Sequence, residues 1–253
     1  MRRIMTESFE KQLLRETAAL PFALNGQQTE QLFRYYELLV EKNKVMNLTA
    51  ITEESEVVTK HFTDSLSIIR ACTANNVSIF EEPDGKSLID IGTGAGFPGL
   101  VLKIAFPGLA VTLSDSLMKR LHFLDEVIAE LGLQDIRTLH GRAEDLGRDK
   151  ALRGQFDFAV SRAVANMSVL SEYDLPFVKK GGYFLAMKAG NVEEELESAE
   201  KAVGILGGKI ENTVHFQLPE TDMERSIVVV RKCLETPGKY PRKAGTPVKN
   251  PLS

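Results

Sequence analysis

The sequence predicts an α/β protein with a mostly parallel seven-stranded sheet, an antiparallel edge and an N-terminal helical extension. Three observations predict this class. Short apolar runs alternate with amphipathic segments from Ser87 to about Lys232, the last two runs leave little room for a helix between them, and the preceding residues keep a helical period. The chain therefore divides into an extension (1–85), a core (86–235) and a tail (236–253).

Within the extension, residues 30–49 and 54–72 repeat apolar side chains at helical spacing. EEPDGKS (81–87) then breaks the pattern and predicts the boundary with the core. Strands are expected at SLIDI, AVTLSD, IRTLH, FDFAVS, YFLAMK, HFQLP and SIVVVRK, with helices at 117–132 and 192–207. The first five strands alternate with helices and predict parallel pairing, whereas the last two predict an antiparallel hairpin. Four prolines in the tail predict a loop rather than a helix.

Composition indicates a globular protein, with 43% hydrophobic and 26% charged residues, and the cysteine usage fits a reducing cytoplasm. The formal charge of −4 requires any nucleic-acid contact to come from a local basic patch. Cys72 and Cys233 are too far apart to suggest a disulfide framework or a zinc site, and the four histidines form no metal-like cluster, so no metal is expected. No secretory signal and no apolar stretch of membrane-spanning length is apparent, so no membrane partner is expected.

LIDIGTGAGFPGL (88–100) places four glycines directly after the first predicted strand. Parallel sheets bind ligands at the carboxyl ends of their strands. The GxGxxG match at 94–99 is weak alone, but Asp115 follows Gly96 by 19 positions, at the end of the next strand. A carboxylate there can accept both hydroxyls of a ribose. Since no Lys-Ser/Thr pair follows the glycines, the loop is not a Walker A motif and predicts a ribose-containing ligand.

Asp90 favours a methyl donor over a dinucleotide. Its carboxylate would repel a pyrophosphate but suits the ammonium and sulfonium of S-adenosylmethionine. Asp90, Gly92, Gly94 and Gly96 form the acid-x-Gly-x-Gly-x-Gly pattern of class I methyltransferases, whose fold is Rossmann-like. The alternative is a glycine-rich strand-to-helix turn that binds nothing.

Further segments carry a closer resemblance. They are NLTAIT, KHFTDSL, LIDIGTGAGFPGLVLKIAFP, VTLSDSLMKRLHFLDEV, LHGRAEDLG, FDFAVSRAVA and YPRKAGTPVKNPL, in this order. Over nearly the whole chain they closely resemble the bacterial family RsmG, also called glucose-inhibited division protein B. The resemblance implies an S-adenosylmethionine-dependent enzyme that methylates N7 of guanine 527 (standard rRNA numbering) in 16S rRNA. It further implies a substrate within the small ribosomal subunit or an assembly intermediate, and we expect a monomer.

Guanine N7 has a free lone pair, so its methylation needs alignment rather than a base, and no candidate base stands out. An Asn/Asp-Pro-Pro-aromatic turn is absent, with Val160-Ser161-Arg162-Ala163 in its place. Arg162 and Arg142, at or beyond strand ends, are the predicted catalytic residues, each able to hold an RNA phosphate, pair with an acid or stack on guanine. For Arg162 the alternative is a structural ion pair. The expected cofactor-binding residues are Asp90, Gly92, Thr93, Gly94, Gly96, Phe97, Asp115, Ser116, Ala143, Glu144 and Arg162.

Each acidic residue of this set has a structural alternative. Asp90 can be a charge at a helix N-terminus, Asp115 a helix cap and Glu144 a solvated first-turn acid. For Asn47-Leu48-Thr49 and His61-Asp64-Ser65, which match family positions, we expect only capping and helix packing.

Basic residues that could complete an RNA surface are Lys119, Arg120, Lys179, Lys180, Lys188, Lys239, Arg242, Lys243 and Lys249. The tail, whose charge is all of one sign, is expected to grip RNA phosphates while cofactor binding persists without it. The alternative is a disordered tail of no consequence. Two other functions stay open: a methyltransferase for small molecules or proteins, and a methyl-donor-binding regulatory module without catalysis.

Overall fold

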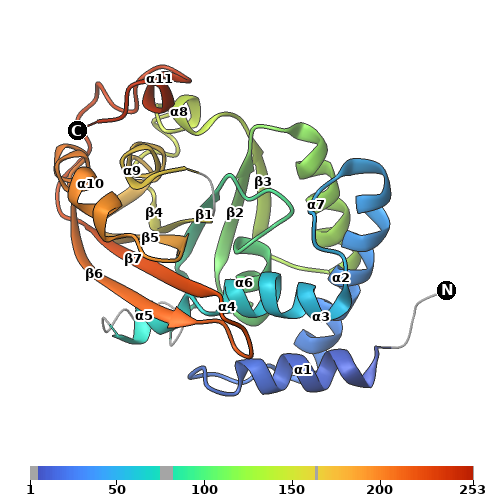
Figure 1. Cartoon of the computed structure of the whole chain (residues 1–253). Coiled ribbons are helices and arrows are strands. Elements are labelled where there is room, and N and C mark those ends of the chain that lie inside the picture. Colours follow the sequence, from blue (N-terminus) through green and yellow to red (C-terminus); the bar gives the residue numbers. More distant parts are fainter. Residues whose placement is uncertain (1–4, 75–81, 163–164, 253) are drawn as a thin grey trace.

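A seven-stranded sheet with strand order β3-β2-β1-β4-β5-β7-β6 forms the centre of the molecule (Figure 1). The structure is a computed structural model that describes residues 5–74, 82–162 and 165–252. The strands are β1 (Ser87–Ile91), β2 (Ala110–Asp115), β3 (Ile136–His140), β4 (Phe156–Arg162), β5 (Val178–Ala189), β6 (Gly208–Gln217) and β7 (Glu224–Lys232). The first five pair in parallel, and β7 runs antiparallel to both β5 and β6. The predicted fold class and its antiparallel edge are confirmed.

Helices cover both faces of the sheet. They are α1 (Glu7–Thr17), α2 (Gly26–Met46), α3 (Glu54–Val57), the π-helix η1 (Val58–Thr63), α4 (Asp64–Leu66), α5 (Ile69–Ala74), α6 (Gly99–Ala105), α7 (Met118–Leu131), α8 (Ala143–Leu146), α9 (Met167–Asp174), α10 (Glu193–Ile205) and α11 (Thr246–Lys249). Successive side chains of β1 point to opposite faces, so Leu88 joins a core with the extension, α6 and α7, whereas Ile89 joins one with α9 and α10. None of the described helices is long and apolar enough to cross a membrane.

The extension is helical in its described part and packs into the core. Phe9, Tyr35 and Phe62 are fully buried in the same apolar cluster as Leu100 of α6 and Leu124 of α7. This burial removes apolar surface from water and fixes the extension against one face of the sheet. The predicted boundary segment 81–87 lies partly outside the described residues.

The extension residues with family-like positions have the structural roles expected of them. Asn47 ends α2 in the left-handed conformation, with φ 48°, and its N–H bonds the carbonyl of Asn43. The Thr49 hydroxyl lies 2.8 Å from Nε2 of His61, and the Ser65 hydroxyl donates to the His61 carbonyl. Capping and packing are confirmed, although His61 and Asp64 also enter the network described below.

Two predictions of local structure need correction. β6 begins at Gly208, well before the predicted HFQLP, because this edge strand exposes one face and so carries few apolar residues to mark it. The tail holds the one-turn helix α11, although we expected only loop. Pro247 stands at the beginning of that turn, where a missing N–H costs no helical hydrogen bond.

Candidate active site

A cavity of about 380 Å³ opens at the carboxyl ends of β1 to β4. We call it the first cavity. Its lining residues are Ile91, Gly92, Ser114, Asp115, Ser116, Arg120, Gly141, Arg142, Ala143, Glu144, Arg162, Tyr173, Gly245 and Val248. Seven of the residues predicted for the site therefore meet around one space: Gly92, Asp115, Ser116, Arg142, Ala143, Glu144 and Arg162. Its volume is within the range of small-molecule sites.

Asp115 ends β2 and lines the first cavity with its carboxylate 4% exposed. Its Oδ1 accepts from the Leu117 N–H at 2.8 Å, and its Oδ2 accepts from the Gly94 N–H at 3.0 Å and from Arg120 at 3.2 Å. The carboxylate thus organises the turn into α7, as the capping alternative predicts. A carboxylate has about four lone-pair sites, so acceptor capacity remains for a ligand in the cavity.

Asp90 is fully buried and does not line the first cavity. Its Oδ2 accepts from the Thr93 hydroxyl at 2.7 Å and from the Gly99 N–H at 2.8 Å, which closes the glycine loop on itself. Burial raises the pKa of this carboxyl to about 6. Its Oδ1 has no hydrogen-bond partner among the described residues. The Asp90 side chain thus points toward α6, and its expected place beside the cofactor ammonium, directly or through water, stays a prediction.

Of the predicted loop residues, Gly92 lines the first cavity, whereas Thr93, Gly94, Gly96 and Phe97 are not among its lining residues, so their contact with the cofactor stays a prediction. Gly96 has φ +106°, and a Cβ there would meet Oη of Tyr35 at 2.6 Å and Cδ2 of Leu124 at 2.9 Å. This glycine admits the close approach of α2 and α7. Gly94 has φ +61°, and a Cβ there would meet nothing nearer than 3.9 Å, so the lack of a side chain serves the left-handed turn and not close packing.

A matched pair of alanine variants separates these two roles of glycine. Gly94→Ala is expected to cost about 1–2 kcal/mol of unfolding free energy, because only the left-handed backbone is strained. Gly96→Ala adds overpacking against Tyr35 and Leu124 and is expected to cost about 1–3 kcal/mol more. Denaturant unfolding followed by circular dichroism measures both. Equal destabilisation of the two variants would contradict the packing role of Gly96.

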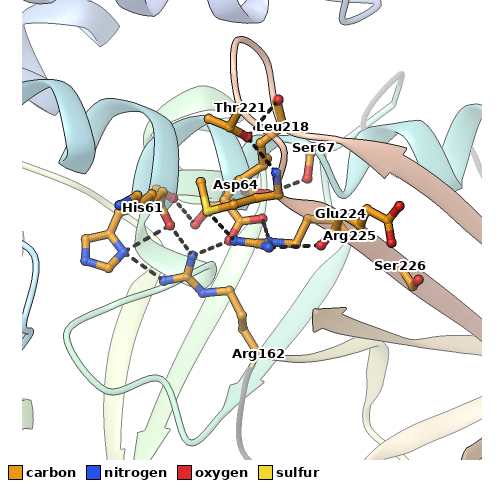
Figure 2. A network of polar contacts seen from close by, with 12 residues as sticks. His61, Asp64, Ser67, Arg162, Leu218, Thr221, Glu224, Arg225 and Ser226 are labelled. Carbon is orange, nitrogen blue, oxygen red and sulfur yellow. Dashed lines mark hydrogen bonds and ion pairs between the residues drawn. The ribbon is translucent and has the colours of Figure 1, made fainter. Parts of the chain in front are cut away.

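Arg162 ends β4 and joins the core to the extension (Figure 2). Its Nη1 donates to Oδ2 of Asp64 at 3.0 Å and to the Lys60 carbonyl at 3.1 Å. Its guanidinium carbon lies 5.0 Å from the ring centroid of Phe97, which stacks on His61 at 4.3 Å. Arg162 thus forms the structural ion pair of the alternative interpretation and also lines the first cavity. Ala163, in the same motif, lies outside the described residues.

His61 cannot act as a base near neutral pH. Burial, and then the charge of Arg162, lower the pKa of its imidazole to about 3. The ring is therefore neutral, and its two nitrogens lie within hydrogen-bond distance of Thr49, Lys60 and Arg162. We expect a pH–rate profile without a limb from this histidine.

The tail docks on the first cavity through Glu144, which is not the solvated acid considered as an alternative. Glu144 is 4% exposed, accepts from the Gly245 N–H at 2.7 Å and hydrogen-bonds Tyr173. Burial, and then the charge of Glu144, raise the pKa of Tyr173 to about 12. Gly245 and Val248 of the tail consequently form part of the cavity wall, and Figure 1 places α11 beside α8.

Arg242, an expected RNA contact, is held in a structural ion pair. Its guanidinium donates to both carboxylate oxygens of the buried Glu172, at 3.0 and 3.1 Å from Nε and 2.7 Å from Nη2. Arg148 and Arg153 add bonds to tail carbonyls, among them that of Pro241 at 2.8 Å and that of Tyr240 at 2.7 Å. The tail is thereby fastened along its length, contrary to the disordered alternative.

The other predicted basic residues divide by position. Lys179 and Lys180 begin β5, so they lie at the sheet edge opposite the cavity, and Lys179 pairs with Asp157. They therefore do not adjoin the first cavity, and their part in an RNA surface stays a prediction. Lys188 donates to Glu195 at 2.8 Å, and Arg120 pairs with Asp115. The exposed lysines that stay candidates for RNA contact are Lys119, Lys239, Lys243 and Lys249.

Sequence reasoning missed Tyr173, Val248, Asp64 and Arg225 as site residues. Asp64 stood out only by its family-like position. Arg225 directly precedes the predicted strand 226–232, and Tyr173 lies in α9, which the sequence pattern did not predict. Spacing along the chain cannot reveal such contacts, since Asp64 and Arg225 are 161 residues apart.

The parallel sheet, the glycine turn and the carboxylate at the end of β2 define the class of Rossmann-like methyltransferases. Solved structures share this fold at low identity. A structure of MtNAS in complex with MTA and tNA has a TM-score of 0.52 at 16% identity, covering 82% of this chain and 74% of that one. A 16S rRNA (adenine(1408)-N(1))-methyltransferase from Catenulisporales acidiphilia, crystallised with SAM, has a TM-score of 0.50 at 14% identity, covering 64% and 92%.

The chain belongs to the family described as rRNA small subunit methyltransferase G, whose model matches residues 28–228. Two relatives carry the name "Ribosomal RNA small subunit methyltransferase G". The one from Lachnoclostridium phytofermentans is 53% identical over 92% of this chain and 93% of its own length. The one from Lactococcus lactis subsp. cremoris is 53% identical over 90% of this chain and 93% of its own length. These findings confirm the predicted family and class, a methyltransferase that uses S-adenosylmethionine.

Proposed function

We propose that this protein transfers the methyl group of S-adenosylmethionine to N7 of guanine 527 in 16S rRNA. The observation that carries the proposal is the convergence of Asp115, Arg142 and Arg162 on one cavity in a chain of this family. The names of the relatives support small-subunit rRNA as the substrate. The finer assignment, to N7 of one guanine, rests on the family resemblance and on the chemistry that the cavity offers.

The lining of the first cavity suits S-adenosylmethionine, which supplies a methyl group activated on a sulfonium. Asp115 offers carboxylate oxygens for the ribose hydroxyls, and Gly92 leaves backbone accessible beside them. Ile91 and Val248 supply apolar surface for the adenine, with Ala143 and Ser116 at the same wall. The roles of Ala143, Ser116 and Glu144 toward the cofactor stay part of the proposal, with Glu144 acting by holding the tail.

Methylation at N7 fits the side chains around the cavity because no proton has to be removed. The carboxylate of Glu144 hydrogen-bonds Gly245 and Tyr173, and that of Asp115 accepts from two N–H groups and Arg120, so neither is presented as a free base. His61 is neutral and belongs to another cavity. What the described residues can do is orient the two reactants, exclude water and provide the guanidinium of Arg162 at the substrate side.

The substrate class is tested by incubating the protein with methyl-labelled S-adenosylmethionine and, separately, small ribosomal subunits, naked rRNA and cell extract. We expect label in small-subunit rRNA. Label only in small metabolites or protein would contradict the proposal and favour the alternative enzymes. Binding of the cofactor with no label anywhere would favour a regulatory module. Comparison of naked rRNA, assembly intermediates and finished subunits identifies the preferred form of the substrate.

Asp115→Ala is expected to weaken S-adenosylmethionine binding by about tenfold to a hundredfold, because a buried diol loses its acceptor. Titration calorimetry measures the dissociation constant. Asp115→Asn, which keeps one acceptor oxygen, serves as the graded control and is expected to lose less. Unchanged affinity in Asp115→Ala, in a variant that remains folded, would remove Asp115 from the cofactor site.

A further inference from the structure

A second cavity, of about 370 Å³, shares Arg162 with the first. The extension, β4, β5 and β7 all contribute to it, among others through Ile51, Asp64, Arg162, Met187, Met223 and Arg225. Because Arg162 borders both spaces, a molecule in the second cavity lies next to one in the first. The function proposed above leaves this second space without an occupant.

The polar side of the second cavity holds Lys60, His61 and Lys188, of which the two lysines pair with Glu56 and Glu195. At its centre, two guanidinium groups meet one carboxylate (Figure 2). Oδ2 of the buried Asp64 accepts from Arg162 at 3.0 Å, and its Oδ1 accepts from Nε of Arg225 at 3.1 Å. One negative charge thus holds two positive charges, which leaves a net positive charge at the wall. The two arginine side chains are 15% and 19% exposed, so they remain partly accessible from the cavity.

The remaining wall is apolar and polarizable. Ile51 of the extension, Met187 of β5 and Met223 of the β6–β7 loop face the same space as the arginines. Apolar and thioether groups pack well against a planar aromatic ring, whereas a phosphate alone would gain nothing from them. The volume and the mixture of surfaces fit a purine base rather than an isolated anion.

The π-helix η1 brings the extension to this place. Lys60 and His61 lie within η1, and Asp64 follows it directly. π-helical turns are rare and occur frequently at functional sites, because they change which side chains share a face. Here the carbonyl of Lys60 and the carboxylate of Asp64 both accept from Arg162, so the turn positions the arginine between the two cavities.

We propose that the second cavity receives the guanine to be methylated, turned out of the RNA strand, with Arg162 and Arg225 as donors to its O6 and to the adjoining phosphate, while the lone pair of N7 stays free to attack the methyl group. This inference rests on the proposed function. An enzyme that acts on a base takes that base out of the stack into a pocket. O6 of guanine is an acceptor, for which arginine is a matching donor. In this proposal the N-terminal extension forms one side of the substrate site.

Ala189→Phe fills the second cavity without removing a side-chain polar contact, since Ala189 is exposed at the end of β5 and lines this cavity but not the first. We expect the KM for the small-subunit substrate to rise by about tenfold or more, with the dissociation constant of S-adenosylmethionine unchanged. Ser198→Phe, on the exposed side of α10, is the matched control and is expected to behave as wild type. Both variants are tested in the full-length chain.

Arg225→Gln is the second variant, because Arg225 does not line the first cavity. We expect the same separation, a higher KM for RNA at unchanged cofactor affinity. Wild-type kinetics in both Ala189→Phe and Arg225→Gln would overturn the proposal, as would a parallel loss of cofactor binding in Ala189→Phe. If the wild-type protein itself leaves small-subunit rRNA unlabelled, the proposed function fails instead, so the two failures are distinguishable.

Discussion

Arg162→Gln will lower the rate of methyl transfer by about 10²–10³-fold, while the dissociation constant of S-adenosylmethionine changes by less than about tenfold. Arg162 lines both cavities, and its guanidinium lies over Phe97 at the boundary between them. Asp115 and Val248, the groups proposed for the ribose and adenine, are separate side chains of the first cavity that the substitution leaves in place. The loss should therefore be expressed in kcat rather than in cofactor affinity.

The control for Arg162→Gln separates the loss of the guanidinium from the loss of its ion pair with Asp64. Removing the arginine leaves a buried carboxylate that has only Arg225 as an ionic partner among the described residues, so the variant is expected to lose stability as well. Asp64→Asn also breaks the ion pairs but keeps the guanidinium, and it should retain more activity than Arg162→Gln at similar thermal stability. Equal losses of methyl transfer and cofactor affinity in Arg162→Gln would show that Arg162 serves the cofactor.

Truncation after Glu235 will weaken S-adenosylmethionine binding by about tenfold or more and lower methyl transfer with it. The sequence suggested the opposite for the cofactor, namely that its binding would persist without the tail. The structure revises this because Gly245 and Val248 form part of the first cavity. Truncation also leaves the buried Glu172 and Glu144 without their tail partners, which adds a loss of stability.

A point variant separates the cofactor wall from the RNA surface of the tail. Val248→Asp is expected to reduce cofactor affinity without removing any of the tail's hydrogen bonds. Lys243→Ser combined with Lys249→Ser should instead leave cofactor affinity unchanged and flatten the salt dependence of RNA binding, by about 0.7 in slope for each phosphate that the tail no longer binds. Identical cofactor affinity in the truncated and full-length chains would contradict the proposed wall.

The pattern of apolar residues along the sequence predicted most of the strands and the edge of the sheet where the candidate site lies. Buried parallel strands carry apolar runs that stand out, and their carboxyl ends converge, so Gly92, Asp115 and Ala143 were brought together by topology alone. The direction of each side chain was not predictable in this way. Asp90 and Gly96 fit the motif, yet one turns toward Gly99 and the other admits Tyr35 from a separate helix.

The spacing of residues along the sequence also did not predict contacts between distant segments. Asp64 contacts Arg162 and Arg225 because η1 brings it to the end of β4 and the beginning of β7. The spacing of these residues along the chain does not indicate this contact. Arg242 has the appearance of a solvated cation in a basic tail, but the buried Glu172 on α9 holds it. The charges of one sign in the tail therefore did not reveal that Arg242 is held in a buried ion pair.

The atom and the nucleotide that receive the methyl group test the central claim most directly. N7-methylated guanine, unlike guanine, becomes sensitive to strand scission after borohydride reduction and aniline treatment, and primer extension locates the break. Small subunits that lack the modification are incubated with the protein and S-adenosylmethionine. We predict one enzyme-dependent break, at guanine 527 of 16S rRNA, that is absent with Arg162→Gln. Labelled rRNA without a break at that guanine, or with the break at another, would contradict the account.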